Sequence, residues 1–181
     1  MKKTFIILFF FVCGIATQAQ FKTAILQASG LTCAMCTKAI NNSLEELSFV
    51  ESVKADIKNS AFKIVFKPGI AMDIDELKKG VEDAGFSVAK LRLTGSFSNI
   101  EIKNDEHVVI NGNTYHFLKV NNQTLNGEKE ITIVDKNFLT AKEFKKFTAA
   151  TNMHCIQTGR AESCCKKEAG AEHSRIYHAT I

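Results

Sequence analysis

Tryptophan is absent from this chain of 181 residues, and Pro68 is its only proline. No Pro-rich linker therefore separates modules. The formal net charge is only +4, and it falls to +2 once Lys2 and Lys3 are removed with the segment described next. So small a charge does not favour nucleic acid or an anionic membrane as a partner. The length suggests one domain or two small ones, at about 100–200 residues per domain.

The longest apolar run lies close to the first residue. Lys2 and Lys3 precede the apolar residues 5–16, and residues 17–19 offer small side chains where a signal peptidase cleaves. This layout predicts a secretory signal peptide over residues 1–19. The run is too short to span a bilayer, which needs about 20 residues. We therefore expect an exported protein, periplasmic or secreted, with no stable membrane insertion after cleavage.

Residues 21–93 show the alternation and spacing of a complete βαββαβ unit. An Asp73/Glu76 capping relation predicts the start of its second helix, and Gly85 predicts the end. The sequence thus predicts an α+β fold that opens with a ferredoxin-like domain. The expected elements are a strand at 23–29, a helix from 36, strands at 51–56 and 61–67, a helix over 74–84 and a strand over 86–93.

After residue 93 the pattern changes. A turn is expected at 94–96, and turn dipeptides stand at Asn111-Gly112 and Asn126-Gly127. Thr140 and Glu143 predict a capping box on a short helix. We expect a small β-rich domain over 97–150, a meander or partly open barrel with one helix, and a flexible tail over 151–181. The short β-rich runs lie at 99–103, 107–110, 115–120 and 130–134.

Cysteine usage points to metal or redox chemistry. An exported protein meets an oxidising environment, where cysteines normally pair. An odd number cannot all pair within one chain, so at least one thiol is left for metal or another partner. The five cysteines beyond the signal segment are Cys33, Cys36, Cys155, Cys164 and Cys165.

Cys33 and Cys36 form a C-x-x-C pair, with one cysteine on a loop and the other opening a helix. The unpaired N–H groups and the dipole of a helix N-terminus lower the thiol pKa and favour the thiolate. Soft thiolates select Cu(I) and Zn(II), and two of them suit the low coordination number of Cu(I). A structural zinc site needs four ligands, whereas residues 21–93 contain two cysteines and no histidine. An open pair of this kind is suited to handing an ion on.

The sequence from Gly30 to Cys36, GLTCAMC, resembles the G-M-T-C-x-x-C motif of heavy-metal-associated domains. That family includes copper chaperones, the amino-terminal domains of copper-transporting P-type ATPases and periplasmic mercury-binding proteins. The resemblance covers residues 21–93 and includes the Gly85-Phe86 pair after the second helix. It implies that Cys33 and Cys36 are the metal ligands, and that the protein works without catalysis.

The neighbours of the pair refine what the resemblance implies. In this family an uncharged residue at the position of Thr32 accompanies Cu(I), and an acidic one accompanies Zn(II). Leu31 stands where the family has a methionine that packs beneath the loop, and a leucine is expected to pack in the same way. Phe86 matches an aromatic residue found near the site in ATPase domains. Met35 is expected to pack in the loop. The resemblance therefore favours Cu(I), with Zn(II) or Hg(II) as alternatives.

The leading hypothesis is an exported carrier or buffer of Cu(I) that exchanges the ion with a metal-transporting or metal-accepting protein. Three other interpretations stay open. Cys33 and Cys36 could form a structural disulfide after export. They could also serve thiol–disulfide exchange, although the aromatic residue and the cis-proline typical of thioredoxin-like proteins are missing. The β-rich part could instead make this a non-catalytic interaction protein.

A second group of soft ligands lies in the tail. Cys155, Cys164 and Cys165 predict a second metal site, and histidines at 154, 173 and 178 stand near them. The alternative is a disulfide from Cys155 to Cys164 or Cys165. His107 and His116 fall in strand patterns and are expected to be ordinary surface or core histidines.

Overall fold

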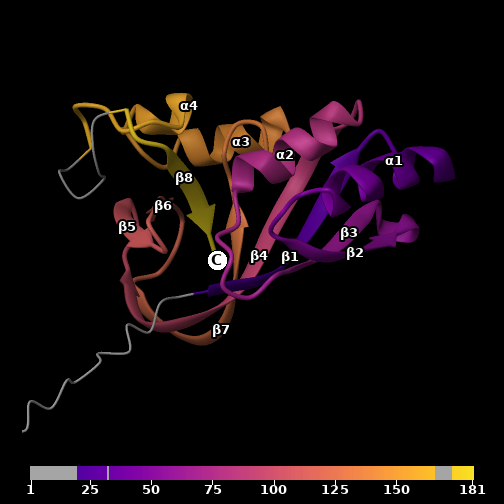
Figure 1. The fold of residues 1–181 in the computed structure, drawn as a ribbon. Helices are drawn as coiled ribbons and strands as arrows, with labels where there is room; N and C mark the ends of the chain where they lie inside the picture. The colour runs from indigo at the N-terminus through magenta and orange to yellow at the C-terminus, as the bar shows by residue number, and fades with distance from the viewer. Residues whose placement is uncertain (1–19, 32, 166–172) are drawn as a thin grey trace, which may run out of the picture.

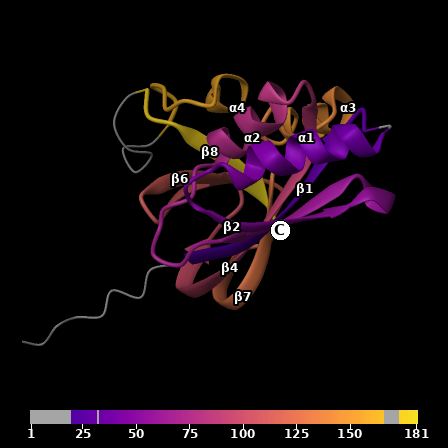
Figure 2. The same ribbon diagram turned by 45° about the vertical axis from the view of Figure 1, so that its right-hand side comes forward.

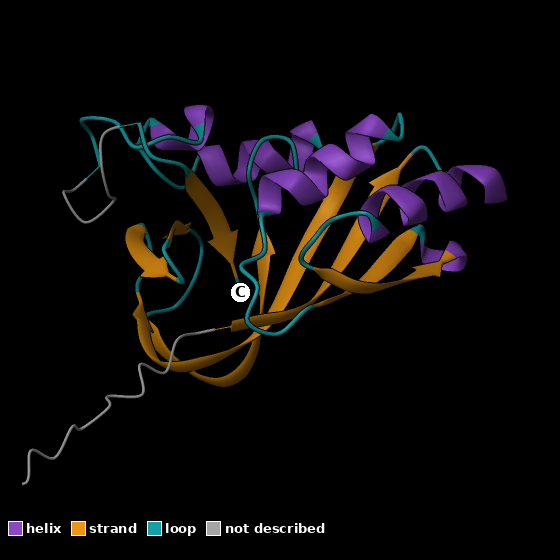
Figure 3. Cartoon of the chain, viewed as in Figure 1, coloured by secondary structure: helices purple, strands orange, loops and turns teal. Residues whose placement is uncertain are grey.

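The computed structural model describes residues 20–31, 33–165 and 173–181. The expected signal peptide at 1–19 lies outside the described residues. The eight strands of the described part form a single sheet in the order β2-β3-β1-β4-β7-β8-β6-β5. Helices α1 to α4 lie on the same side of this sheet (Figures 1 and 3). None of the described helices is long and apolar enough to cross a bilayer.

The first half of the sheet has the ferredoxin-like arrangement that the sequence predicts. Its four strands follow the order β2-β3-β1-β4, and every neighbouring pair is antiparallel. The elements are β1 (Gln20–Ser29), α1 (Ala34–Glu45), β2 (Val50–Asp56), the short 3₁₀ helix η1 (Ile57–Asn59), β3 (Ala61–Phe66), α2 (Ile74–Asp83) and β4 (Ser87–Ile102).

The two helices of this unit bury one apolar stripe each against the strands. Full burial of one such aliphatic side chain contributes about 1.5–3 kcal/mol. The helices also contact each other directly, because the hydroxyl of Ser43 in α1 donates a 2.8 Å hydrogen bond to the carbonyl of Gly80 in α2. The buried residues facing the sheet are Ile40 and Leu44 of α1 and Ile74, Leu77 and Val81 of α2.

The expected boundary between two domains falls inside β4, and this prediction is wrong. β4 continues through residues 94–96, where we expected a turn, and pairs along its other edge with β7 (Gln123–Ile133). Gly95 lies opposite Phe21 of the neighbouring antiparallel strand β1, at an irregularity in their pairing, and a Cβ there would lie 2.8 Å from the carbonyl oxygen of Gln20. The β-rich part thus extends the first sheet and is not a separate unit.

The two turn dipeptides behave differently from each other. Asn111-Gly112 joins β5 (Glu106–Ile110) to β6 (Asn113–Phe117) as predicted, with φ of 52° and 79°. Positive φ at both positions is what a two-residue type I′ hairpin turn requires. Asn126-Gly127 is not a turn but part of β7, opposite an irregularity in β4, and the side chain of Asn126 accepts a 2.7 Å hydrogen bond from the backbone N–H of Asn99.

The expectation of a flexible tail over 151–181 is also corrected. Residues of the tail form α4 (Cys155–Thr158) and β8 (Ile176–Thr180). β8 lies inside the sheet, antiparallel to β7 and parallel to β6. Its first four residues are all buried. A short central strand that is covered on both faces shows no alternation, so the pattern in the sequence did not indicate it.

The last helix to place is α3 (Ala141–Thr148). Its capping box is confirmed: Thr140 accepts a hydrogen bond from the N–H of Glu143, and the Glu143 carboxylate accepts one from the N–H of Thr140. Phe144 packs with Leu118 and Ile156, which joins α3 to the end of β6 and to α4.

The sheet also curls, since the rings of Phe21 in β1 and Tyr115 in β6 lie 6.1 Å apart (Figure 2).

Candidate metal centre

The C-x-x-C loop connects β1 to α1. Cys33 is exposed and is the N-cap of α1, and its Sγ accepts a 3.2 Å hydrogen bond from the backbone N–H of Cys36. Cys36 is half-buried in the first turn of the helix. Gly30, with φ of 81°, turns the chain out of β1 toward this loop. The two sulfurs therefore lie together at the helix N-terminus, as the sequence predicts.

Cys33 and Cys36 are joined as a disulfide, and their Cα atoms are 5.4 Å apart. This is the oxidised form of the pair. Reduction would leave two neighbouring thiols in the field of the helix N-terminus, which favours the thiolate. The first turn of α1 contains no acidic side chain that would oppose this effect.

The side chains around the pair lie partly as expected. Leu31 is half-buried and packs against the main core, in the role that the resemblance implies. Phe86 lies beside the loop, since a Cβ on Gly30 would be 3.9 Å from its ring. Met35 does not pack in the loop, contrary to the prediction: it is 75% exposed. It stands between the two cysteines in the sequence, and most of its side chain faces solvent. Thr32 is outside the described residues.

Two of the three tail cysteines come together in the structure. Cys155 is fully buried as the first residue of α4, and half-buried Cys165 packs against it. Cys164 is exposed, and its Sγ accepts a 3.2 Å hydrogen bond from the backbone N–H of His154. All three are free cysteines. The disulfide that we considered for the tail is therefore not formed.

The structure adds two residues that the sequence analysis set aside. Cys155 Sγ lies 3.8 Å from His107 Nε2 and 3.7 Å from His116 Nδ1. The three ligand atoms all lie within 4.8 Å of one another. A signal for the two histidines of this cluster was present in the sequence. A two-residue turn at Asn111-Gly112 fixes the hairpin register, and that register puts His107 opposite His116.

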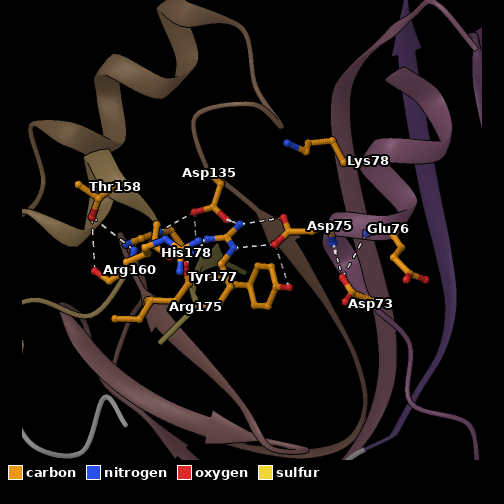
Figure 4. Close-up of polar contacts among 12 residues, drawn as sticks. Asp73, Asp75, Glu76, Lys78, Asp135, Thr158, Arg160, Arg175, Tyr177 and His178 are labelled. Carbon is orange, nitrogen blue, oxygen red and sulfur yellow. Dashed lines mark hydrogen bonds and ion pairs between the residues drawn. The ribbon is translucent and has the colours of Figure 1, made fainter. Parts of the chain in front are cut away.

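Of the other tail histidines, His178 packs against this cluster, with its ring centroid 5.2 Å from that of His116 in an edge-on arrangement. His178 is buried in β8, and its Nδ1 lies 2.5 Å from the carboxylate of Asp135. The same carboxylate binds Arg175, which also contacts Asp75 in α2 (Figure 4). His173 is exposed. The polar network of Figure 4 thus attaches β8 to the first half of the fold and offers no sulfur ligand.

Comparison with known proteins finds relatives of the first half of the chain. Residues 25–87 match the family model described as heavy-metal-associated domain. Copper-transporting ATPase 2 of Mus musculus is 32% identical over 72 residues, which are 40% of this chain and 5% of the ATPase. Copper-transporting ATPase HMA5 of Oryza sativa subsp. japonica is 25% identical over 78 residues, 43% of this chain and 8% of that protein. The matched region is thus a small part of these relatives.

Solved structures align with the same share of the chain. The CopZ metallochaperone is 22% identical, with a TM-score of 0.35, and the alignment covers 37% of this chain and 98% of that one. Oxidized MerP from Ralstonia metallidurans CH34 is 22% identical, with a TM-score of 0.34, over 38% of this chain and 97% of its own. The resemblance to heavy-metal-associated domains is confirmed for residues 25–87, and the family match ends at the beginning of β4.

Proposed function

We propose, from the match of residues 25–87 to the heavy-metal-associated domain, that this protein binds Cu(I) through Cys33 and Cys36 and passes it to another protein. The observation that carries the proposal is the adjacency of the two sulfurs on an exposed loop at the N-terminus of α1. Export to the periplasm or the outside of the cell is part of the same proposal and rests on residues 1–19.

Transfer by ligand exchange fits the geometry of this loop. The exposed Sγ of Cys33 can be approached from solvent, while Cys36 is half-covered by the domain. Two protein thiolates leave a soft ion accessible to the thiolates of a partner, so the ion can move through intermediates that both proteins share. The exposed Met35 lies between the ligands, on the surface that such a partner would approach.

Reduction is a condition of this function. In the disulfide form neither sulfur carries the thiolate that binds a soft metal. Two equivalents of a thiol reductant convert the disulfide to two thiols and are themselves oxidised to a disulfide. The thiols then lose their protons as Cu(I) binds. The protein must therefore meet a reductant before it meets the ion, or receive the ion while its thiols are still reduced.

The test is an anaerobic Cu(I) titration of the reduced protein against a chromogenic Cu(I) chelator. We expect the Cys33→Ser/Cys36→Ser variant to bind one tightly held equivalent fewer than the wild type. Cys164→Ser is the matched control because that exposed thiol lies outside both clusters of ligands. A double variant with unchanged stoichiometry and affinity would overturn the assignment. Competition by Zn(II) and Hg(II) in the same assay ranks the alternative metals.

A second candidate function is thiol–disulfide exchange, which the Cys33–Cys36 disulfide favours. Its nucleophile would be the exposed Cys33, and Cys36 would resolve the mixed disulfide. An insulin-reduction assay with dithiothreitol separates the two proposals. Turnover that disappears in Cys33→Ser, together with no retention of Cu(I), would support exchange. Tight Cu(I) binding without turnover would support transfer.

A further inference from the structure

The β5–β6 hairpin places two imidazoles side by side. His107 and His116 are directly opposite in the antiparallel register, and their rings stack with centroids 4.5 Å apart. His116 is fully buried and His107 half-buried. Imidazole nitrogens are common ligands for Zn(II) and other borderline ions. The hairpin therefore holds two potential ligands on one face. Their relative position is set by the backbone hydrogen bonds of the hairpin.

Cys155 completes a triangle above this pair. Its buried Sγ is 3.8 Å from His107 Nε2 and 3.7 Å from His116 Nδ1. In a tetrahedral zinc site, Zn–N bonds of about 2.0–2.1 Å and a Zn–S bond of about 2.3 Å put nitrogen and sulfur roughly 3.5 Å apart. The observed separations differ from that value by only a few tenths of an ångström. Small side-chain shifts would close the three atoms around one ion.

A fourth ligand is available beside Cys155. Cys165 is half-buried and packs against Cys155 in the same small cluster. Cys164 faces solvent and binds the backbone of His154 instead. Cys165 is thus the tail cysteine that packs beside Cys155. Two imidazoles and two thiolates are a ligand set on which structural zinc sites are built.

A carboxylate orients one of the ligands from behind. His116 Nε2 lies 2.9 Å from Asp105 Oδ1. If Nε2 of His116 carries the proton and donates it to this carboxylate, Nδ1 is the unprotonated nitrogen. Nδ1 faces Cys155, so its lone pair points toward the proposed ion. Metal-bound histidines usually have such a partner, which fixes the tautomer and the orientation of the ring. Asp105 is therefore a positioning residue.

We propose that the sulfur and nitrogen atoms of His107, His116, Cys155 and Cys165 form a second metal site, which holds a tetrahedrally coordinated Zn(II) ion. Unlike the exposed pair at Cys33, this site brings three ligand atoms within 4.8 Å of one another, two of them from fully buried side chains, and Cys165 would be the fourth ligand. It suits retention of an ion, not its transfer. The ion would attach α4 and the tail to the β5–β6 hairpin, and the site is independent of the function proposed for Cys33 and Cys36.

The test uses the reduced full-length Cys33→Ser/Cys36→Ser variant, so that the first pair cannot contribute. Co(II) serves as a spectroscopic probe, and Zn(II) is then added to displace it. We expect one equivalent of Co(II) with intense visible absorption typical of tetrahedral coordination and a thiolate-to-metal charge-transfer band. In the same background, Cys155→Ser and His107→Ala should lose this spectrum, and Zn(II) should no longer raise the unfolding temperature.

Matched variants separate ligands from bystanders. Cys165→Ser should weaken Co(II) binding and reduce the charge-transfer intensity, whereas Cys164→Ser should change neither. His154→Ala is the histidine control, because that exposed ring pairs with Glu162. Asp105→Asn should lower the affinity for Zn(II) by about 10- to 100-fold while the tetrahedral spectrum is kept. A purely structural role for Asp105 would change stability without changing this affinity.

Three results would overturn the proposal. One is the absence of a tetrahedral Co(II) spectrum in the folded background variant. Another is an unchanged spectrum in both His107→Ala and Cys155→Ser. The third is an intact mass that shows a Cys155–Cys165 disulfide and no bound metal in protein purified with Zn(II) present. His107 is chosen over the fully buried His116 because its replacement leaves the core intact, and circular dichroism confirms folding.

Discussion

Arg175, the residue before β8, forms a two-pronged ion pair with Asp75 in the first turn of α2. Arg175 Nε lies 2.8 Å from one carboxylate oxygen of Asp75, and Nη2 lies 3.1 Å from the other. Nη2 also contacts Asp135 at 2.8 Å, so one guanidinium serves two carboxylates (Figure 4). The pair joins residues 100 positions apart and fixes the last strand to the first half of the fold.

The first prediction concerns the strength of this pair. Asp75→Asn removes one charge but keeps the shape of the side chain. The Asp75 side chain is 42% exposed, so solvent screens the interaction, and we expect the free energy of unfolding to fall by about 1 kcal/mol. Urea unfolding at pH 7 measures the change. Asp83→Asn is the control, because its pair with Lys79 is exposed and 3.7 Å long, and it should change stability by less than about 0.5 kcal/mol.

The second prediction concerns the pH dependence of the same contribution. Burial acts to raise the pKa of Asp75, but the hydrogen bonds and the charge of Arg175 outweigh it and hold the pKa below the usual 3.8. A carboxyl group with a depressed pKa in the folded state stabilises the fold above its unfolded pKa, and this contribution is lost as the pH falls through the folded pKa. The difference in stability between wild type and Asp75→Asn should therefore be constant from pH 7 to about 5 and shrink in stronger acid. A difference that persists unchanged in strong acid would contradict this account.

The third prediction concerns the close approach of the paired strands β1 and β4 at Gly95. In Gly95→Ala the new methyl group would lie 2.8 Å from the carbonyl oxygen of Gln20 and 3.1 Å from the Cα of Phe21, both backbone atoms that cannot rotate away. We expect a loss of about 1–3 kcal/mol in the free energy of unfolding. Gly80→Ala is the matched control: its methyl group would make ordinary contacts at 3.5 Å, and helix propensity should stabilise α2 by up to about 1 kcal/mol. Equal effects of the two substitutions would exclude the steric explanation.

The sequence predicted the first half of the fold well because each local signal there is decided by neighbours along the chain. The cap of Asp73, the stripe of α2 and the alternation of β3 need no distant partner. Gly95 was taken for a turn residue, but a glycine is needed there because the backbone of Gln20 lies too close for a side chain. Gln20 is 75 positions away, so the local sequence carries no sign of this contact. The same holds for β8, whose burial depends on the strands on both of its sides.

The candidate sites divide in the same way. Cys33 and Cys36 are three residues apart, so their proximity follows from local geometry. The opposition of His107 and His116 could have been derived from the Asn111-Gly112 turn. Their contact with Cys155 could not, because it depends on how α4 is placed over the hairpin. That placement follows from tertiary packing of Ile156 with Leu118 and Phe144.

The fourth prediction separates packing from exposure in the C-x-x-C loop. Met35 is 75% exposed, so Met35→Ala removes almost no buried surface and should change the free energy of unfolding by less than about 0.5 kcal/mol. Leu31 is half-buried against the core, and Leu31→Ala should cost about 1–2 kcal/mol. Both effects can be measured by urea unfolding of the reduced protein. The Cu(I) affinity of Met35→Ala, measured against the same chelator, should equal that of the wild type if two thiolates alone hold the ion. A tenfold loss of affinity without a loss of stability would make the Met35 thioether a third ligand, and coordination by two sulfurs would then be wrong.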